Sequence, residues 1–277
     1  MILVSGASGN VGRCVVRQLM AADEPVRVLT RDPSTARFPV GVEVVGGDLT
    51  DPASLAGAFD GITHMFFFTP ANGGVAAVQA AAAGGVHRVV VLSSAATQKA
   101  DPRINPIAAR HDAVEKAVQA AGLSWTFLRP DSFAANVLAW APSIRSEGVV
   151  RAAYGRSLRN PIHEQDVAAV ATVALLQSGH EGKAYMLTGP VALTQIDQVE
   201  AIGVAIGRAV RFEEWSRQQA FDDMTRRMPA EVAERLLDYA AKSVGHAPAV
   251  TSVVEDITGR PARAFSEWAQ DHAADFG

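Results

Sequence analysis

The sequence predicts an α/β protein built on a doubly wound parallel sheet, and three observations support this fold class. Short apolar runs alternate with helical patterns through the first two-thirds of the chain, the runs are almost continuously hydrophobic, and a glycine-rich turn follows the first run. Continuous apolar runs are typical of parallel strands that helices cover on both faces. Ligands of such sheets bind at the carboxyl ends of the strands.

The apolar runs and the residues that flank them define the expected elements. A helix is expected to begin at Asp51-Pro52, because aspartate caps a helix and proline suits its first position. Gly84-Gly85 ends an alanine-rich helix, and a further helix is expected over 106–121. Strands are expected at 2–4, 26–30, 42–45, 65–69, 88–93, 125–128 and 184–187.

The alternation weakens after Arg129-Pro130, where we expect a second lobe. Residues 131–162 lack strand alternation, and a helix is expected over 161–177. Thr194 is expected to cap a helix that ends at Ile206, and a short strand is expected at 210–215. Ser216 and Gln219 have the spacing of a capping box, and helices dominate thereafter. We therefore expect a Rossmann domain of residues 1–130 and 163–189, beside a smaller, mostly helical substrate lobe of residues 131–162 and 190–277.

The glycine-rich turn Gly6-Ala7-Ser8-Gly9-Asn10-Val11-Gly12 predicts a dinucleotide site. Glycine adopts turn dihedrals that a Cβ forbids, and it lets the backbone approach an anion closely. Free N–H groups at the start of the next helix then face a pyrophosphate, with the helix dipole in support. The alternative is an ordinary turn. The predicted cofactor contacts here are Gly6, Ser8, Gly9, Asn10, Val11 and Gly12.

The residues after the second strand favour NADP(H), with NAD(H) as the alternative. Sites selective for NAD usually carry Asp or Glu at this place, which would repel a 2′-phosphate. This chain has Thr30 and Arg31 instead, and a guanidinium binds a phosphate with two parallel hydrogen bonds. Arg31 could also be a solvated loop residue whose charge Asp32 dilutes.

Other cofactor contacts are expected where later strands end. Asp48, followed by Leu49, is placed to accept a hydrogen bond from the adenine amino group, or it is an ordinary capping aspartate. Residues after the fourth and fifth strands are candidates to line the nicotinamide ribose. The further predicted contacts are Leu49, Thr69, Pro70, Ser93, Arg129 and Pro130.

Several segments, in their order along the chain, resemble the NmrA-like, NAD(P)-binding branch of the atypical short-chain dehydrogenase/reductase superfamily. The resemblance covers essentially the whole chain. It implies a doubly wound sheet with a small substrate lobe, and either an NADPH-dependent reductase of quinones and dyes or a redox sensor that binds the cofactor without turnover. The segments are Gly6–Gly12, Gly47-Asp48-Leu49-Thr50, Val91-Leu92-Ser93-Ser94, Leu128-Arg129-Pro130, Tyr185–Pro190 and Ile257-Thr258-Gly259-Arg260-Pro261.

Members of this superfamily with the usual catalytic apparatus carry a Tyr-x-x-x-Lys pair on the helix before the sixth strand. The matching stretch here begins with Ile107, which cannot donate a proton, and ends with His111 in place of the lysine. His111 is therefore the candidate catalytic residue, because it could hydrogen-bond the ribose or donate a proton with a pKa near neutrality. As a structural residue it would instead be satisfied by Asp112 or Glu115.

The missing acid narrows the expected chemistry. A positioned general acid contributes about 3–5 kcal/mol to lowering a barrier, and reduction of a simple ketone needs it. A quinone or similar conjugated acceptor needs it far less, because its anion is delocalised. We therefore expect an NADPH-dependent oxidoreductase that transfers hydride to a small conjugated acceptor. A non-catalytic NADP(H)-binding sensor is the main alternative, and an isomerase or lyase ranks below it.

Candidate substrate residues lie beyond the sixth strand, and each could equally be a packing residue or a cap. They are Phe133, Asn136 and His163. The sequence identifies neither the substrate nor the oligomeric state, for which a homodimer is one option.

Composition restricts the partners and the compartment. Hydrophobic residues make up 48% of the 277 residues, so a substantial core is expected. The net charge of −4, without a basic block, argues against nucleic acid and anionic membranes as partners. The single cysteine, Cys14, suits a reducing compartment, and the scattered histidines predict no metal site. No apolar run approaches the ~18 residues of a membrane span, so a cytoplasmic protein is expected.

Overall fold

The computed structural model describes residues 1–277 and divides them into two compact units. Unit 1 consists of Met1–Pro130, Glu164–Leu187 and Asp256–Gly259. Unit 2 consists of Asp131–His163, Thr188–Glu255 and Arg260–Gly277. The chain passes from one unit to the other near residues 130, 163 and 188, and residues 256–259 belong to unit 1.

Unit 1 is built on a seven-stranded sheet with the order β11-β6-β5-β4-β1-β2-β3. Every neighbouring pair is parallel, so all seven carboxyl ends lie at one edge. This arrangement confirms the predicted doubly wound parallel sheet. The strands are β1 (Ile2–Ser5), β2 (Val26–Thr30), β3 (Glu43–Gly46), β4 (His64–Phe68), β5 (Arg88–Leu92), β6 (Ser124–Pro130) and β11 (Lys183–Leu187).

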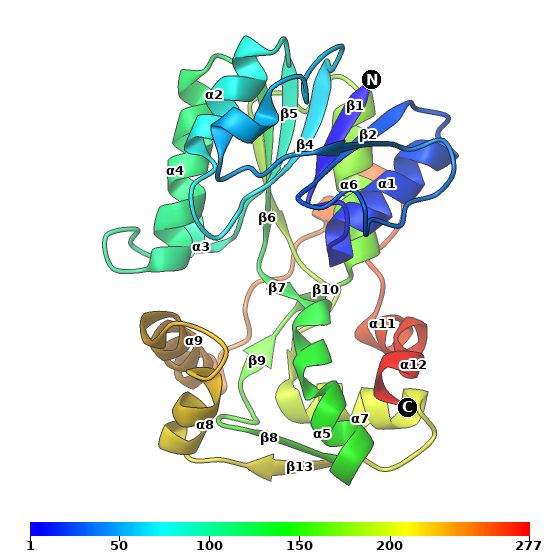
Figure 1. Ribbon diagram of the computed structural model, residues 1–277. Coiled ribbons are helices and arrows are strands. Elements are labelled where there is room, and N and C mark those ends of the chain that lie inside the picture. Colours follow the sequence, from blue (N-terminus) through cyan, green and yellow to red (C-terminus); the bar gives the residue numbers. More distant parts are fainter. The chain divides into compact units, whose positions relative to one another are not determined.

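Helices cover both faces of this sheet (Figure 1). Helices α1 (Asn10–Ala21) and α6 (Glu164–Leu176) pack against each other on one face. Helices α2 (Val75–Ala83) and α4 (Pro106–Ala120) cover the other, together with the 3-10 turn η1 (Pro52–Leu55). The short helix α3 (Ala96–Lys99) packs on α4. The expected helix at Asp51-Pro52 is thus a single 3-10 turn, which Asp51 caps by accepting from the Ala53 N–H.

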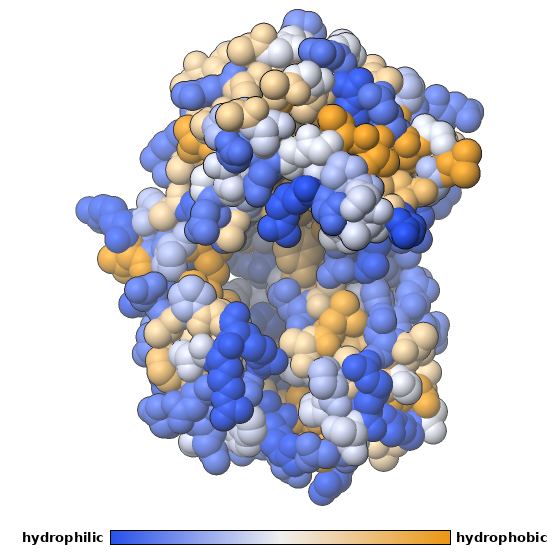
Figure 2. Space-filling view, viewed as in Figure 1, coloured by the Kyte–Doolittle hydropathy of each residue, from blue (hydrophilic) through white to orange (hydrophobic).

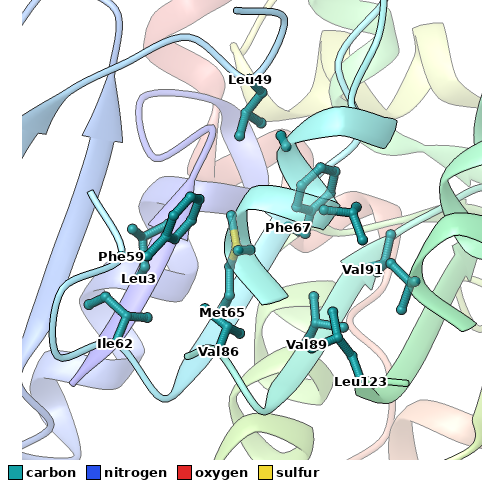
Figure 3. Close-up of a cluster of buried hydrophobic side chains, with 14 of the residues drawn as sticks. Leu3, Leu49, Phe59, Ile62, Met65, Phe67, Val86, Val89, Val91 and Leu123 are labelled. Atoms are coloured by element: carbon teal, nitrogen blue, oxygen red, sulfur yellow. The ribbon is translucent and has the colours of Figure 1, made fainter. Parts of the chain in front are cut away.

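Alternate residues of the central strands form the larger core (Figure 3). Leu3 of β1, Met65 and Phe67 of β4, and Val89 and Val91 of β5 all point to the face that α2 and α4 cover. Strand residues two apart lie on the same face, so the residues between them pack on the opposite side. Because both faces are buried there, the middle residues of β1, β4 and β5 are apolar, as the sequence indicated, whereas the edge strand β3 is largely exposed.

A buried ion pair fixes α4 to the sheet. Arg129 in β6 donates to both carboxylate oxygens of Glu115 in α4, at 3.0 and 2.5 Å. The Ser93 hydroxyl, just beyond β5, donates to the same carboxylate at 2.5 Å. The side chains of Arg129 and Glu115 are only 15% and 7% exposed. Three elements of unit 1 therefore meet at one carboxylate near the carboxyl edge of the sheet.

Unit 2 is mostly helical and contains three two-stranded sheets. A core cluster that includes Ile144, Ile202 and Trp268 joins its helices. The strands are β7 (Ser132–Phe133), β8 (Val149–Ala152), β9 (Leu158–Arg159), β10 (Pro161–Ile162), β12 (Leu193–Thr194) and β13 (Arg211–Glu214). The helical elements are η2 (Ala134–Trp140), α5 (Ala141–Glu147), α7 (Gln195–Ala205), α8 (Arg217–Met224), α9 (Ala230–Lys242), α11 (Phe265–Asp271) and α12 (Ala273–Phe276), and α10 (Val253–Thr258) extends into unit 1.

Two expectations for this region are corrected. The helix expected from Pro161 begins only at Glu164, because Pro161–Ile162 pairs with Ser132–Phe133 as a short strand. Residues 131–162, expected without strands, hold four of them. The expected caps are confirmed: Thr194 with Asp197, and Ser216 with Gln219, each form a capping box.

The visible surface of each unit is mixed, with hydrophilic side chains interspersed with separate apolar patches (Figure 2). None of the helices combines the length and the apolarity that crossing a membrane requires.

Replacing Glu115 with alanine leaves the buried guanidinium of Arg129 without its counter-charge. We expect this change to lower the free energy of unfolding by about 3–5 kcal/mol. The control is Lys116→Ala, which breaks the exposed pair with Asp112 on the same helix and costs less than about 1 kcal/mol. Urea denaturation measures both, and similar losses for the two variants would contradict this account of the ion pair.

Candidate functional site

The glycine-rich turn lies between β1 and α1, at the carboxyl edge of the sheet in unit 1. Gly6 follows β1 with a φ of +62°, a conformation that L side chains rarely adopt. The Gly9 N–H donates to the Gly6 carbonyl at 3.0 Å and closes the turn. Ser8 and Gly9 are exposed, so solvent or a ligand can reach the turn from outside.

The turn leaves backbone hydrogen-bond donors unused at the start of α1. No side chain caps α1, and its first turn contains no acidic residue. The first turn of any helix leaves its N–H groups without partners inside the helix. Here Asn10, Val11 and Gly12 provide those N–H groups, next to the positive end of the helix dipole. This donor set suits a diphosphate.

The close approach within the turn requires glycine. A Cβ on Gly12 would lie 2.1 Å from the Gly6 carbonyl oxygen, and one on Gly6 would lie 2.7 Å from Cβ of Phe68. The first of these clashes is with backbone, which a side-chain rotation cannot relieve. The residues present thus fit the pyrophosphate of a dinucleotide, with α1 held close to the end of β1.

Arg31 follows β2 and is exposed, and its guanidinium makes no hydrogen bond or ion pair. Asp32 forms no ion pair with it; the Asp32 carboxylate instead accepts from the backbone N–H and the hydroxyl of Ser34. These hydrogen bonds lower the pKa of Asp32. A free cation at this position can bind a 2′-phosphate.

Asp48 follows β3, and its contacts favour the alternative that it is a turn residue. Its Oδ1 accepts from both the backbone N–H and the hydroxyl of Thr50, each at 2.8 Å. These hydrogen bonds, with a smaller contribution from the charge of Arg31, lower the pKa of Asp48. That the other carboxylate oxygen of Asp48 accepts a hydrogen bond from the adenine amino group stays a prediction. The neighbouring Leu49 is buried in the core.

The predicted ribose-lining residues at the ends of β4, β5 and β6 are mostly buried and engaged. Thr69, which is 3% exposed, donates to the Leu92 carbonyl, and Pro70 beside it is buried. The Ser93 hydroxyl and the Arg129 guanidinium both bind Glu115. Pro130 is buried at the end of β6. Contacts of these residues with a cofactor stay predictions.

The stretch that replaces the tyrosine–lysine pair lies in the first half of α4. Ile107 donates its backbone N–H to the cap Asn105, and its side chain carries no acid. Burial, and then the positive charge of Arg110, lower the pKa of His111 to about 3. The imidazole is therefore neutral at physiological pH. This differs from the expected pKa near neutrality, because protonation of a side chain that is only 8% exposed is unfavourable.

Neither acidic neighbour satisfies His111, contrary to the structural alternative. Asp112 pairs with Lys116, and Glu115 pairs with Arg129. The partner of His111 is Arg110, whose Nη2 lies 3.3 Å from Nε2, while the buried Nδ1 has no partner.

The three predicted substrate residues all lie in unit 2. Phe133 ends β7 and is half-buried, and Asn136 in η2 is exposed. His163 is 1% exposed and its Nε2 lies 3.3 Å from the Asp271 carboxylate in α11, a contact typical of a packed structural histidine. Their role in substrate binding stays a prediction.

Three residues with features of a binding site were not identified from the sequence. Phe68, the last residue of β4, is 42% exposed and lies beside the glycine turn. Arg110 precedes His111 and has a buried Nε without a partner. Arg159 of unit 2 stacks on Tyr239, with its guanidinium carbon 4.1 Å from the ring centroid. Of the three, only Phe68 could have been identified from the sequence, because it lies near the end of an expected strand.

No group of three or more His, Cys, Asp or Glu side chains is arranged to hold a metal ion.

Comparisons with known proteins agree with this geometry. A family model described as NAD(P)H-binding matches residues 6–178. A (4-alkanoyl-5-oxo-2,5-dihydrofuran-3-yl)methyl phosphate reductase of Streptomyces griseus is 43% identical over 284 residues, covering 100% of this chain and 99% of that protein. An NAD(P)H azoreductase of Xenophilus azovorans is 36% identical, covering 100% and 99% of the two chains. The crystal structure of an NADPH-dependent quinone oxidoreductase from Escherichia coli superposes with a TM-score of 0.81 at 25% identity, covering 98% and 99%.

These findings confirm the predicted cofactor class, NAD(P)H. The matched region begins at the first glycine of the turn. It includes five of the seven strands of the sheet, all except β1 and β11.

Gly12→Ala is expected to weaken NADPH binding roughly a hundredfold or more, because the new methyl group forces the turn away from α1. Gly9→Ala provides a graded comparison, since its Cβ would lie 3.2 Å from the Gly6 oxygen and a small shift relieves it. Calorimetric titration measures both affinities, and thermal melting shows whether each variant is folded. Equal affinities for the two variants would contradict the steric argument.

Proposed function

This chain belongs to the NAD(P)H-binding family, in its NmrA-like group of reductases, and we propose that it transfers hydride from NADPH to a small conjugated acceptor. When bound, the nicotinamide supplies the hydride. The chain's own residues would bind the diphosphate at the α1 N-terminus and the 2′-phosphate at Arg31. They would also hold the nicotinamide end near the carboxyl ends of β4 and β5.

The observation that carries the proposal is the lack of a proton donor in the stretch where superfamily members with the usual catalytic apparatus carry a tyrosine. Ile107 has no ionisable group. His111, with a pKa of about 3, is uncharged at neutral pH and does not act as an acid there. The Ser93 hydroxyl is already bonded to Glu115. An acceptor that delocalises the electron pair it receives suits such a site, because water can deliver the proton after hydride transfer.

The names of the relatives support the same substrate class. The Streptomyces griseus relative reduces a dihydrofuranone whose ring double bond is conjugated with a ring carbonyl and an alkanoyl group. Hydride addition to such an alkene places the electron pair between two carbonyl groups. An azo bond and a quinone, named for two other relatives, are likewise electron-poor conjugated acceptors. We propose an acceptor of this kind for this chain, with a carbon–carbon double bond or a quinone ring as the reduced group.

The test is the rate of NADPH oxidation by the purified protein with a panel of acceptors. The panel contains a 3-acyl-dihydrofuranone, a quinone and an azo dye, each paired with a saturated ketone of similar size. We expect turnover with at least one conjugated acceptor and at least about a hundredfold slower reaction with its ketone counterpart. Tight NADPH binding without any turnover would contradict the proposal and favour a redox sensor.

Replacing Arg31 with aspartate is expected to reduce the preference for NADPH over NADH at least about tenfold, because a carboxylate repels the 2′-phosphate. The matched control is Arg37→Asp, a charge reversal in the same exposed loop, where Arg37 donates to backbone carbonyls. The ratio of kcat/KM for the two coenzymes measures the preference. An equal change in both variants would show a general charge effect and remove the role given to Arg31.

A further inference from the structure

Two neighbouring side chains in α4 bury polar atoms that have no partner. They are Nε of Arg110 and Nδ1 of His111, and the one other such atom in the chain is Oδ1 of Asn160 in unit 2. Nearly all buried polar atoms in proteins are hydrogen-bonded, so an exception calls for a specific explanation. The two atoms lie on the helix that carries the stretch aligned with the missing tyrosine and lysine.

The contact between the two side chains determines where the hydrogen of the imidazole lies. A guanidinium has only donors, so Arg110 Nη2 must donate to His111 Nε2 across their 3.3 Å separation. A neutral imidazole carries one hydrogen, and Nε2, as an acceptor, does not hold it. The hydrogen is therefore on Nδ1, the atom without a partner.

The protein offers no acceptor to that hydrogen. His111 and Glu115 are one helical turn apart on α4, but Glu115 already accepts from Ser93 and Arg129. Asp112, the next residue of α4, already accepts from Lys116. Arg110 itself is cationic, so it can only donate. A buried N–H donor without an acceptor costs about 1–3 kcal/mol, which an oxygen of a ligand would recover.

We propose that Arg110 is a positioning residue that fixes the His111 tautomer, and that His111 presents Nδ1–H as a neutral donor to an oxygen atom of the bound ligand. This inference rests on the proposed function for the identity of the ligand. The oxygen belongs either to a ribose hydroxyl of NADPH or to the carbonyl of the acceptor that takes up negative charge.

This role differs from that of a general acid. Hydride adds to the acceptor carbon, the π electron pair moves onto the conjugated carbonyl oxygen, and NADP⁺ remains. His111 keeps its hydrogen throughout and stabilises the oxygen by a hydrogen bond. Water supplies the proton that completes the reduction. A neutral imidazole is suited to this role because it can donate a hydrogen bond to the oxygen and still keep its hydrogen.

The first test measures the tautomer in the full chain without any turnover. Long-range ¹H–¹⁵N spectra of protein labelled at histidine are expected to show hydrogen on Nδ1 of His111, with no titration between about pH 5 and 9. Arg110→Met is expected to produce a second population with hydrogen on Nε2. Hydrogen on Nε2 in the unmodified protein, or titration near neutrality, would overturn the inference.

The second test adds NADPH and uses two isosteric variants. His111→Asn keeps an N–H near the position of Nδ1, whereas His111→Gln moves it to the position of Nε2. We expect either the NADPH affinity or kcat/KM to fall roughly tenfold in the glutamine variant and less than about threefold in the asparagine variant. A loss in NADPH affinity assigns the oxygen to the ribose, and a loss in kcat/KM at unchanged affinity assigns it to the acceptor. Equal behaviour of the two variants would overturn the inference.

Two controls separate this inference from the proposed function. Gln119→Ala changes an exposed residue of the same helix and is expected to leave both quantities unchanged. If no acceptor is reduced but NADPH shifts the Nδ1–H resonance, the inference stands and the proposed function fails. If acceptors are reduced but His111 carries its hydrogen on Nε2, the proposed function stands and the inference fails.

Discussion

The close approach of helix α1 to the end of strand β1 is the constraint on which the site depends. The space between Gly12 and the Gly6 carbonyl is too small for a methyl group, so the helix begins directly at the sheet edge. Its free N–H groups are thereby fixed at the edge where all seven parallel strands end. The order of those strands then brings Arg31, Asp48 and Ser93 to the same edge, although they are far apart in the sequence.

A second constraint is the carboxylate of Glu115, which holds α4 against β5 and β6. It accepts hydrogen bonds from the Ser93 hydroxyl, just beyond β5, and from the Arg129 guanidinium in β6. Fixing α4 in this way buries His111 one turn earlier on the same helix. Burial keeps the imidazole neutral, so the protonation state of His111 follows from the packing of the helix.

Features that depend on neighbours in the sequence were predictable. The glycine turn, the Thr194 and Ser216 caps, and the limits of α2 and α4 all follow from local backbone preferences, and the structure agrees with them. The short strand at Pro161–Ile162 was not predictable, because it exists only through pairing with Ser132–Phe133. The pKa of His111 was also missed, since burial is a tertiary property that no residue pattern reveals.

The most direct test of the account follows the hydrogen atoms of the reaction. With NADPH deuterated at C4 of the nicotinamide and a dihydrofuranone acceptor in ordinary water, the account predicts deuterium on the ring carbon β to the carbonyls. With unlabelled NADPH in D₂O, it predicts deuterium only on the carbon between the carbonyls. A product without the nicotinamide label, or no product despite bound NADPH, would contradict direct hydride transfer by this protein.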